Sequence, residues 1–543
     1  MKNKIKAHLK KNWSNYLLLF IFLLALGLRL VNLDRADMQG DEAMNAYRSI
    51  GYNDNLNSER QTTPTQWFEN PPWWTKLSFH DQPPLGFLIQ HTFFTFFGIS
   101  TQTARLPMAV FGALSVLALY LLGRSLFKRQ AGLLAALVMS VFAYHVWISR
   151  TGYFESILIF FCLLSLYYMQ KLAADPAVKN YLLLGVFLGL AFLTKYTMFF
   201  LLPTVFFYLL WSQKKIFFSK KFLLTVVIFL IIISPVIFYN FKVYQTRGHF
   251  DVHFAKLFGQ DLGKDWPIIG NDWQIGEDNL KSVRLWSNFK GIIITLRQNF
   301  GLLNLIIFVA ASLLMFFQWF KKKDKKFLLY FLSLVFLILQ FLIISPVQRL
   351  LPLFIPWFAL AIGYAIYYLS KIMNKKFYYL FQILVVYLIL ANLLLCLNTA
   401  IADNEQKINN KYLRRENYGF EQLHNYLINQ EINFKETLFI YENKLDWFCR
   451  FWYFYADGEI SDRSYASIEY VLKMMKEDGN DYFPQIGFKN FYYIQGLDTL
   501  IDNQVQSNYS EYFINQLDKN NIKIKDIIYR DDGRVAFNVY FFH

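Results

Sequence analysis

Apolar runs long enough to cross a membrane recur along most of the chain. Examples that contain no charged residue are Gly301–Phe320, Phe327–Ile344, Leu350–Ser370 and Phe377–Thr399. An α-helix of about 20 residues spans the hydrocarbon core of a bilayer, which is ~30 Å thick. A soluble helical bundle would rarely offer even one such run. The pattern therefore predicts a polytopic α-helical membrane protein.

Clusters of Lys and Arg between the runs set the predicted topology. Cytoplasmic loops are enriched in these residues, and the basic first 15 residues place the N-terminus in the cytoplasm. We interpret the following run, Tyr16–Leu33, as an uncleaved first helix, because no small-residue cleavage site of a signal peptide follows it. Keeping each later basic cluster inside predicts about 11 transmembrane helices within residues 1–400. Residues 34–103 and 241–290 then form external loops.

Two segments do not fit an ordinary span. Leu85–Phe97 is apolar but would measure only about 20 Å as a helix, so we place it along the outer interface. Tyr181–Trp211 would be roughly 46 Å long as one helix, well beyond the bilayer core. Lys195 lies near its middle, and two short spans would keep the next basic cluster, Lys214–Lys221, in the cytoplasm. Lys195 is then expected near the outer surface.

The last part of the chain, residues 401–543, has a different pattern. Short apolar, β-rich runs occur at Leu438–Tyr441, Phe491–Gln495 and Val535–Phe542, and they alternate with helical patterns such as Ser510–Leu517. We expect a small α/β domain here. An odd number of spans places this domain outside the cytoplasm. The protein is thus predicted to be integral to the plasma membrane, with an extracytoplasmic C-terminal domain.

Net charge and cysteine content narrow the functional classes. The formal charge of +16 could indicate nucleic-acid binding, but the basic residues fall in short clusters between apolar runs. Of the three cysteines, Cys162 and Cys396 lie within apolar runs and Cys449 stands alone. The sequence therefore contains neither a disulfide framework nor a CxxC metal motif. A function at the membrane is favoured over a nucleic-acid partner.

The predicted topology gathers polar residues at the outer membrane surface. Ionisable groups at membrane depth are costly and usually mark a pathway or a site. Each also has an ordinary structural explanation, because acidic residues complement a helix start and basic residues snorkel to lipid head groups. Convergence of both charge signs from separate segments favours a functional site. Its members are Asp41, Glu42, His80, Asp81, Gln82, Arg150, Glu155, Lys195 and Arg349.

Short motifs around these residues resemble a known family. They are Gly40-Asp41-Glu42-Ala43, His80-Asp81-Gln82-Pro83-Pro84-Leu85, Ser149-Arg150 followed by Glu155, Gly189–Lys195, and Gln348-Arg349-Leu350-Leu351-Pro352. Their order and spacing resemble the protein O-mannosyltransferases and the bacterial transferases that attach aminoarabinose to lipid A, which are GT-C type membrane glycosyltransferases. The resemblance covers roughly residues 15–215 and, more weakly, Ser345–Pro356.

The resemblance implies a polyprenyl-monophosphate sugar as donor and a reaction at the extracytoplasmic face. Displacing the phosphate requires a base for the acceptor hydroxyl, and Asp41 is our candidate. Arg349 and Lys195 would bind the leaving phosphate, while Glu155 and Glu42 would orient the sugar or these cations. A single displacement predicts inversion at the anomeric carbon. The acceptor hydroxyl would belong to a lipid, a protein or an envelope glycan.

The chain departs from the family pattern at two positions. Many relatives carry Lys or His directly before the Pro-Pro pair, where this chain has Gln82, and they often carry Asp where Glu155 stands. His80 could then contact the lipid phosphate, and Arg150 is a further substrate-binding candidate. No motif requires a cofactor, although Asp41, His80 and Glu155 could supply ligands to a divalent cation.

Two other functions also fit a membrane protein with buried charge. A flippase or transporter of lipid-linked sugars is one, but transporters often show repeats and broken helices with sites at mid-membrane. A non-catalytic envelope scaffold with an external domain is the other, and it leaves Asp41 and Arg349 unexplained. The gathering of charge at one surface favours the transferase.

The topology can be tested with a reporter fused after His543. A reporter that is active only in the cytoplasm should be silent there, because only an external C-terminus keeps every basic cluster inside. Activity of this reporter would mean that the number of spans is even, with Tyr181–Trp211 the first segment to reassign.

Overall fold

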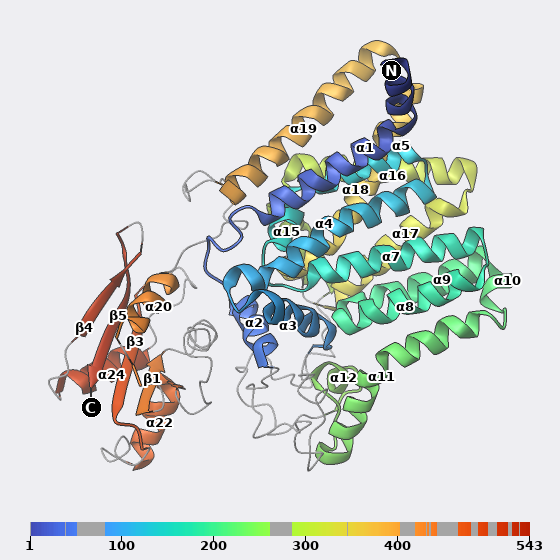
Figure 1. Ribbon diagram of the computed structural model, residues 1–543. Helices are drawn as coiled ribbons and strands as arrows, with labels where there is room; N and C mark the ends of the chain where they lie inside the picture. Colours follow the sequence, from blue (N-terminus) through green and yellow to red (C-terminus); the bar gives the residue numbers. More distant parts are fainter. Residues whose placement is uncertain are drawn as a thin grey trace. The chain divides into compact units, whose positions relative to one another are not determined.

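The computed structural model describes residues 2–38, 40–51, 82–260, 285–344 and 346–401, followed by 419–430, 432–433, 436–441, 465–478, 487–497, 508–519, 524–530 and 533–542. The chain forms two compact units (Figure 1). The first comprises Met1–Leu33, Leu56–Phe93 and Arg105–Arg414. The second comprises Asp34–Asn55, Phe94–Ala104 and Arg415–His543. The change of pattern along the sequence predicted a boundary near residue 400. It did not indicate that Asp34–Asn55 and Phe94–Ala104 group with the C-terminal residues.

Helices build the first unit, as the apolar runs predict. Two 3₁₀ segments, η3 (Tyr196–Phe200) and η5 (Gln348–Phe354), each lead directly into a helix. The helices are α1 (Lys2–Leu30), α3 (Leu85–Phe97), α4 (Thr101–Leu126), α5 (Arg129–Val141), α6 (Ala143–Ser149), α7 (Glu155–Ala174), α8 (Val178–Thr194), α9 (Leu201–Ser212), α10 (Lys214–Phe217), α11 (Phe222–Arg247), α12 (Val252–Leu257), α15 (Leu285–Phe300), α16 (Leu302–Lys322), α17 (Lys325–Ile343), α18 (Ile355–Ile372) and α19 (Lys375–Ile401). Residues 94–104, which join α3 to α4, are part of the second unit.

The helices confirm a multi-pass helical membrane protein. Among the described residues, 7 helices are long and apolar enough to cross a membrane, or 8 if the bent pair α5 and α6 forms one span. The remaining predicted spans fall on shorter apolar helices, which are α8, the Tyr196–Ser212 segment and Gln382–Leu397 within α19. The predicted total of 11 spans therefore stays a prediction.

The break expected near Lys195 is present. Helix α8 ends at Thr194, and Lys195 has an extended backbone (φ −166°, ψ 138°) before η3 begins at Tyr196. The single long helix that would have exceeded the bilayer thickness is thus replaced by two shorter ones. The break also sets the Lys195 side chain at the junction of two elements.

A second break was not expected from the sequence. The apolar run Ala131–Ile148 is long enough for a single span, but α5 and α6, which cover it, meet at an angle of 64°. Phe142 between them has an extended backbone (φ −72°, ψ 114°). A bend frees backbone groups of the helix, and the Asn392 side chain of α19 accepts a hydrogen bond from the Ala143 N–H at 3.4 Å. The partner of the freed N–H thus lies in a helix 249 residues away in sequence.

Small residues let α5 and α18 pack closely. A Cβ atom added at Gly363 of α18 would lie 2.6 Å from the backbone nitrogen of Ala135 and 2.7 Å from the carbonyl oxygen of Ala131. Real Cβ atoms do not approach backbone atoms this closely. Most of α18 is buried, from Ile355 to Ile366. Small residues at helix interfaces in membranes allow such close approach of two backbones, and Figure 1 shows α5, α16 and α18 in one group.

A five-stranded sheet forms the centre of the second unit. Its strand order is β2-β1-β3-β5-β4, with β1 parallel to β2 and β3, and β5 antiparallel to β3 and β4. The elements are β1 (Thr437–Tyr441), β2 (Tyr465–Ser467), β3 (Asn490–Gly496), β4 (Ile524–Tyr529), β5 (Val535–Phe542), α20 (Phe420–Ile428), α22 (Ile468–Asp478) and α24 (Asn508–Lys519). Strands β1, β3 and β5 cover the three segments expected to be strands, and α24 covers the expected helix.

The two faces of this sheet have different coverings. Alternate residues of β1 point to opposite faces, and Leu438 and Ile440 pack with Val471 of α22 and Phe513 of α24. Phe439 and Tyr441 pack instead with Leu423 of α20.

Helix α2 (Gly40–Gly51) belongs to the same core as that second face. Ala43, Ala46, Tyr47 and Ile50 of this helix lie in one buried cluster with residues of β1, β3, β5 and α20. Helix α2 is therefore packed on the sheet that forms about 400 residues later in the chain.

Substitution of Gly363 by Ala tests the close packing of α5 on α18. Ala is intrinsically better than Gly in a helix by about 1 kcal/mol, so a glycine without close neighbours should gain stability. Gly27 of α1 has no atom within 4 Å of its added Cβ. We expect Gly27→Ala to keep or raise the unfolding temperature in detergent and Gly363→Ala to lower it, since overpacking costs about 1–3 kcal/mol. Equal unfolding temperatures for the two variants would contradict this account.

Candidate active site

A buried ion pair joins Glu155 to Lys195. Glu155 is the first residue of α7 and its side chain is fully buried, whereas that of Lys195 is 15% exposed. The Lys195 Nζ donates to Glu155 Oε1, and the N-terminal end of α7 adds favourable electrostatics for a carboxylate. The other oxygen, Oε2, has no hydrogen-bond partner among the described residues. The structure thus brings together two of the residues predicted for the site and leaves one carboxylate oxygen available.

Arg349 lies against an aromatic cluster that connects η5 to α6. Its guanidinium carbon is 5.7 Å from the centre of the Tyr153 ring. Tyr153 packs on Trp147 with ring centres 6.5 Å apart, and Trp147 stacks on Tyr144 at 5.8 Å. The Tyr144 hydroxyl donates to the backbone carbonyl of Gln348, the residue before Arg349. The cation–π contact positions the Arg349 side chain, and the hydrogen bond to Gln348 positions the backbone beside it.

The ion pair and the aromatic cluster lie in the same part of the first unit. Helix α7, which carries Glu155, contacts η5, which carries Arg349. Helix α6 provides a second connection, because it contacts both α7 and η5 and its Tyr144 hydroxyl donates to the Gln348 carbonyl. Glu155, Lys195 and Arg349, which are separated by up to 194 residues in sequence, thus lie on or beside elements that contact α7.

Arg150 has a structural function in the fold. It is 1% exposed, and its guanidinium donates to the carbonyl oxygens of Leu28 (3.1 Å), Arg29 (3.3 Å), Val31 (2.6 Å) and Asn32 (2.9 Å). These carbonyls belong to the last turn of α1 and the residues after it, where helix carbonyls have no partner of their own. Arg150 thus caps α1, and its predicted contact with substrate stays a prediction.

Sequence reasoning did not single out a second buried arginine with a similar function. Arg29 is fully buried, donates to the carbonyl oxygens of Ala25 (2.7 Å) and Ser140 (3.2 Å), and lies 2.6 Å from His145 Nδ1. These contacts bind α1 to α5 and α6.

Asp251 fixes the segment after α11 next to Lys195. Its carboxylate accepts hydrogen bonds from the backbone N–H of His253 (3.1 Å), from the Tyr196 hydroxyl (3.3 Å) and from the Asn240 side chain (3.4 Å). Burial raises the pKa of Asp251 to about 7, against the opposite effect of its hydrogen bonds. Because Tyr196 directly follows Lys195, this cluster supports the backbone from which Lys195 projects. In the sequence, Asp251 is one acidic residue of a predicted external loop, and no motif around it indicated this contact.

The remaining predicted residues occupy other places. Asp41 and Glu42 lie in the first turn of α2 in the second unit, with Asp41 half-buried and Glu42 1% exposed. Gln82 is half-buried just before α3, and its Oε1 has no partner among the described residues. His80 lies outside the described residues.

A metal site among Asp41, His80 and Glu155 has no support in the described residues. No three His, Cys, Asp or Glu side chains in that part of the chain lie close enough together to hold a metal ion. With His80 outside the described residues, the suggested ligand set stays a prediction.

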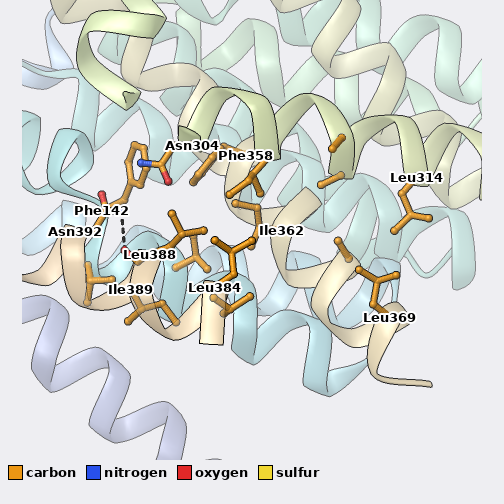
Figure 2. A pocket seen from close by; sticks show the side chains of 17 residues that line it. Phe142, Asn304, Leu314, Phe358, Ile362, Leu369, Leu384, Leu388, Ile389 and Asn392 are labelled. Carbon is orange, nitrogen blue, oxygen red and sulfur yellow. Dashed lines mark hydrogen bonds between the residues drawn. The ribbon is translucent and has the colours of Figure 1, made fainter. Parts of the chain in front are cut away.

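An apolar groove lies between helices of the first unit. Its volume is about 260 Å³. Figure 2 shows Phe142, Asn304 and Asn392 near one end of it and Leu314 and Leu369 near the other. The lining residues come from α5, α16, α18 and α19 and the bend between α5 and α6: Val138, Val141, Phe142, Asn304, Ile307, Ala310, Ala311, Leu314, Phe358, Ile362, Ala365, Leu369, Leu384, Val385, Leu388, Ile389 and Asn392.

The end of the groove at Phe142 is close to the aromatic cluster. Phe142 packs on Phe300 with ring centres 4.9 Å apart, and Phe300 packs on Tyr144 at 5.9 Å. One aromatic ring thus separates the groove from the cluster that holds Arg349.

Comparison with known proteins is consistent with this arrangement. Residues 81–239 match the family model of dolichyl-phosphate-mannose-protein mannosyltransferases. Two Bacillus subtilis proteins, YycA and YkcB, which are named provisionally as mannosyltransferases, are 32% and 34% identical over 126 and 116 residues. These matches cover 23% and 21% of the chain and only 18% and 16% of the two relatives.

Solved structures match the fold over nearly the whole chain. ArnT from Cupriavidus metallidurans bound to undecaprenyl phosphate has a TM-score of 0.60 at 15% identity, covering 96% of this chain and 97% of that one. The oligosaccharyltransferase AglB from Archaeoglobus fulgidus, in complex with an inhibitory peptide and a dolichol-phosphate, has a TM-score of 0.59 at 13% identity, covering 97% of this chain and 74% of that one. The resemblance inferred from the motifs is confirmed, and the chain has the fold of the GT-C type membrane glycosyltransferases.

Proposed function

We propose that the protein transfers a glycosyl residue from a polyprenyl-phosphate-linked sugar to an acceptor hydroxyl at the extracytoplasmic membrane face, with inversion. The observation that carries this proposal is the grouping of Lys195, Glu155 and Arg349 in one part of a membrane fold of this type. The matched family model and the lipid phosphates bound by ArnT and AglB support a donor of this kind.

The two cations suit the departure of a phosphate. As the bond between the anomeric carbon and the phosphate oxygen breaks, its electron pair stays on the phosphate, which leaves as an anion. Arg349 offers a forked, bidentate donor and Lys195 a point charge. Gln82, with an available amide, and His80 are further candidates for contact with the donor head group. In the donor complex, Glu155 would share Lys195 with the phosphate and use its available oxygen to orient the sugar.

Asp41 is the proposed base. The acceptor oxygen attacks the anomeric carbon from the face opposite the phosphate, and its proton passes to a carboxylate. The first turn of α2 favours the ionised form of Asp41, and Glu42 beside it is buried. One displacement with one base inverts the anomeric configuration, in contrast to the paired carboxylates of retaining hydrolases.

The apolar groove suits the hydrocarbon chain of the donor. Its lining is apolar apart from Asn304 and Asn392, and its end at Phe142 lies one ring from the cluster around Arg349. A donor analogue with a very short chain that binds as tightly as the long-chain donor would speak against this assignment.

Arg349→Ala tests the phosphate contact. Hydrogen bonds to charged groups contribute about 1.5–3 kcal/mol, so we expect the affinity for polyprenyl phosphate to fall roughly ten- to a hundredfold. Arg349→Lys should restore part of it, since the charge returns without the fork. The exposed Arg297 of α15 provides the control, because Arg297→Ala removes the same charge elsewhere. Unchanged lipid affinity in Arg349→Ala would remove this residue from the site.

Asp41→Asn tests the base. The substitution keeps the size of the side chain and removes its basicity, so we expect transfer to fall by about 10²–10⁴-fold with donor affinity unchanged. Glu42→Gln should reduce transfer less. Asn caps a helix about as well as Asp, so a purely structural Asp41 predicts near wild-type transfer by the Asn variant. That result would overturn the proposed mechanism.

A further inference from the structure

Two buried polar atoms in the aromatic cluster and the ion pair have no partner among the described residues. One is the indole Nε1 of Trp147, a residue that is 3% exposed, and the other is Oε2 of the fully buried Glu155. Buried polar groups are nearly always hydrogen-bonded, and leaving one without a partner costs about 1–3 kcal/mol. Such groups therefore call for an explanation, and a ligand that is bound during function is one.

The two residues belong to one group of contacts. Trp147 lies on α6, which contacts α7, the helix that begins at Glu155. Trp147 also packs on Tyr153, which precedes Glu155 by two residues and lies against the guanidinium of Arg349. Tyr153 therefore connects Trp147 to Arg349 through ring contacts and to Glu155 through the chain.

The hydrogen-bonding character of these atoms restricts the chemistry of the ligand. An indole N–H only donates, and a carboxylate oxygen only accepts. A phosphate offers acceptors alone and is repelled by Glu155. Hydroxyl groups both donate and accept, so a polyhydroxylated ring can satisfy both atoms while the adjoining phosphate faces Arg349.

We propose that Trp147 and Glu155 form the subsite for the sugar ring of the donor, with the Trp147 N–H donating to one sugar oxygen and Glu155 Oε2 accepting from a sugar hydroxyl. This inference rests on the proposed function and names the part of the site that distinguishes a glycosylated lipid phosphate from a bare one. Trp147 acts as a specificity-determining residue.

Trp357 offers a matched control. It is likewise buried, at 2% exposure, but its Nε1 donates to Ser333 Oγ at 2.7 Å. Replacement of Trp by Phe removes the N–H and keeps an aromatic ring. At position 357 this removes a hydrogen bond to Ser333, whereas at position 147 it removes none to any residue that the structure describes.

The experiment uses purified full-length protein and two probes. One is polyprenyl phosphate, and the other is the polyprenyl-phosphate hexose or pentose that the wild-type protein binds best in a small panel. We expect Trp147→Phe to bind the bare lipid phosphate as the wild type does, to bind the glycosylated lipid about fivefold more weakly, and to keep its unfolding temperature without ligand. Trp357→Phe should show the opposite behaviour, with a lower unfolding temperature and an unchanged ratio of the two affinities.

The outcomes separate this inference from the proposed function. A wild-type protein that binds neither lipid would contradict both. If the wild type prefers the glycosylated lipid and Trp147→Phe keeps the full preference, the sugar subsite is wrong and the transferase proposal is unaffected. If Trp147→Phe lowers the unfolding temperature as much as Trp357→Phe does, the N–H is bound to an internal water, and the inference is again wrong.

Discussion

Burying a charged side chain in the first unit costs free energy, because the charge loses its contact with water. Contacts from distant parts of the chain offset that cost. A buried carboxylate needs a cation or several donors, and breaking such a pair by removing one partner is strongly destabilising. Glu155 at the start of α7 therefore depends on the break at Lys195, which brings an ammonium group to it. Arg150 and Arg29 are also buried, but they are stabilised by backbone carbonyl groups. Carbonyl oxygens at the end of α1 accept from both side chains, and the Ser140 carbonyl accepts a further hydrogen bond from Arg29.

The contacts that offset burial differ between arginines of this chain. Arg150 and Arg349 were both expected to contact substrate; Arg150 is 1% exposed and Arg349 is half-buried. The guanidinium of Arg150 donates to carbonyl groups at the end of α1, whereas that of Arg349 lies over the ring of Tyr153. The first contact is typical of a helix cap, and the second is a cation–π contact.

Sequence reasoning succeeded where a local pattern decides the structure. Apolar runs predicted the helices, a single lysine in an overlong run marked the break at Lys195, and short apolar, β-rich runs marked β1, β3 and β5. It failed where the contacts of a residue come from far away in sequence. The bend at Phe142 has neither Gly nor Pro, and its freed N–H meets Asn392 of α19. Trp147 lies in an apolar run, where the sequence does not distinguish it from a core residue. Only the structure shows that its N–H has no partner in the described part of the chain.

Helix α2 carries Asp41 and Glu42 and shares a hydrophobic core with the C-terminal sheet. A chain cut after residue 400 would retain every candidate residue of the site and yet lose the surface on which α2 is packed. Because α2 and the sheet share this core, a displacement of the sheet would also displace the helix that carries Asp41.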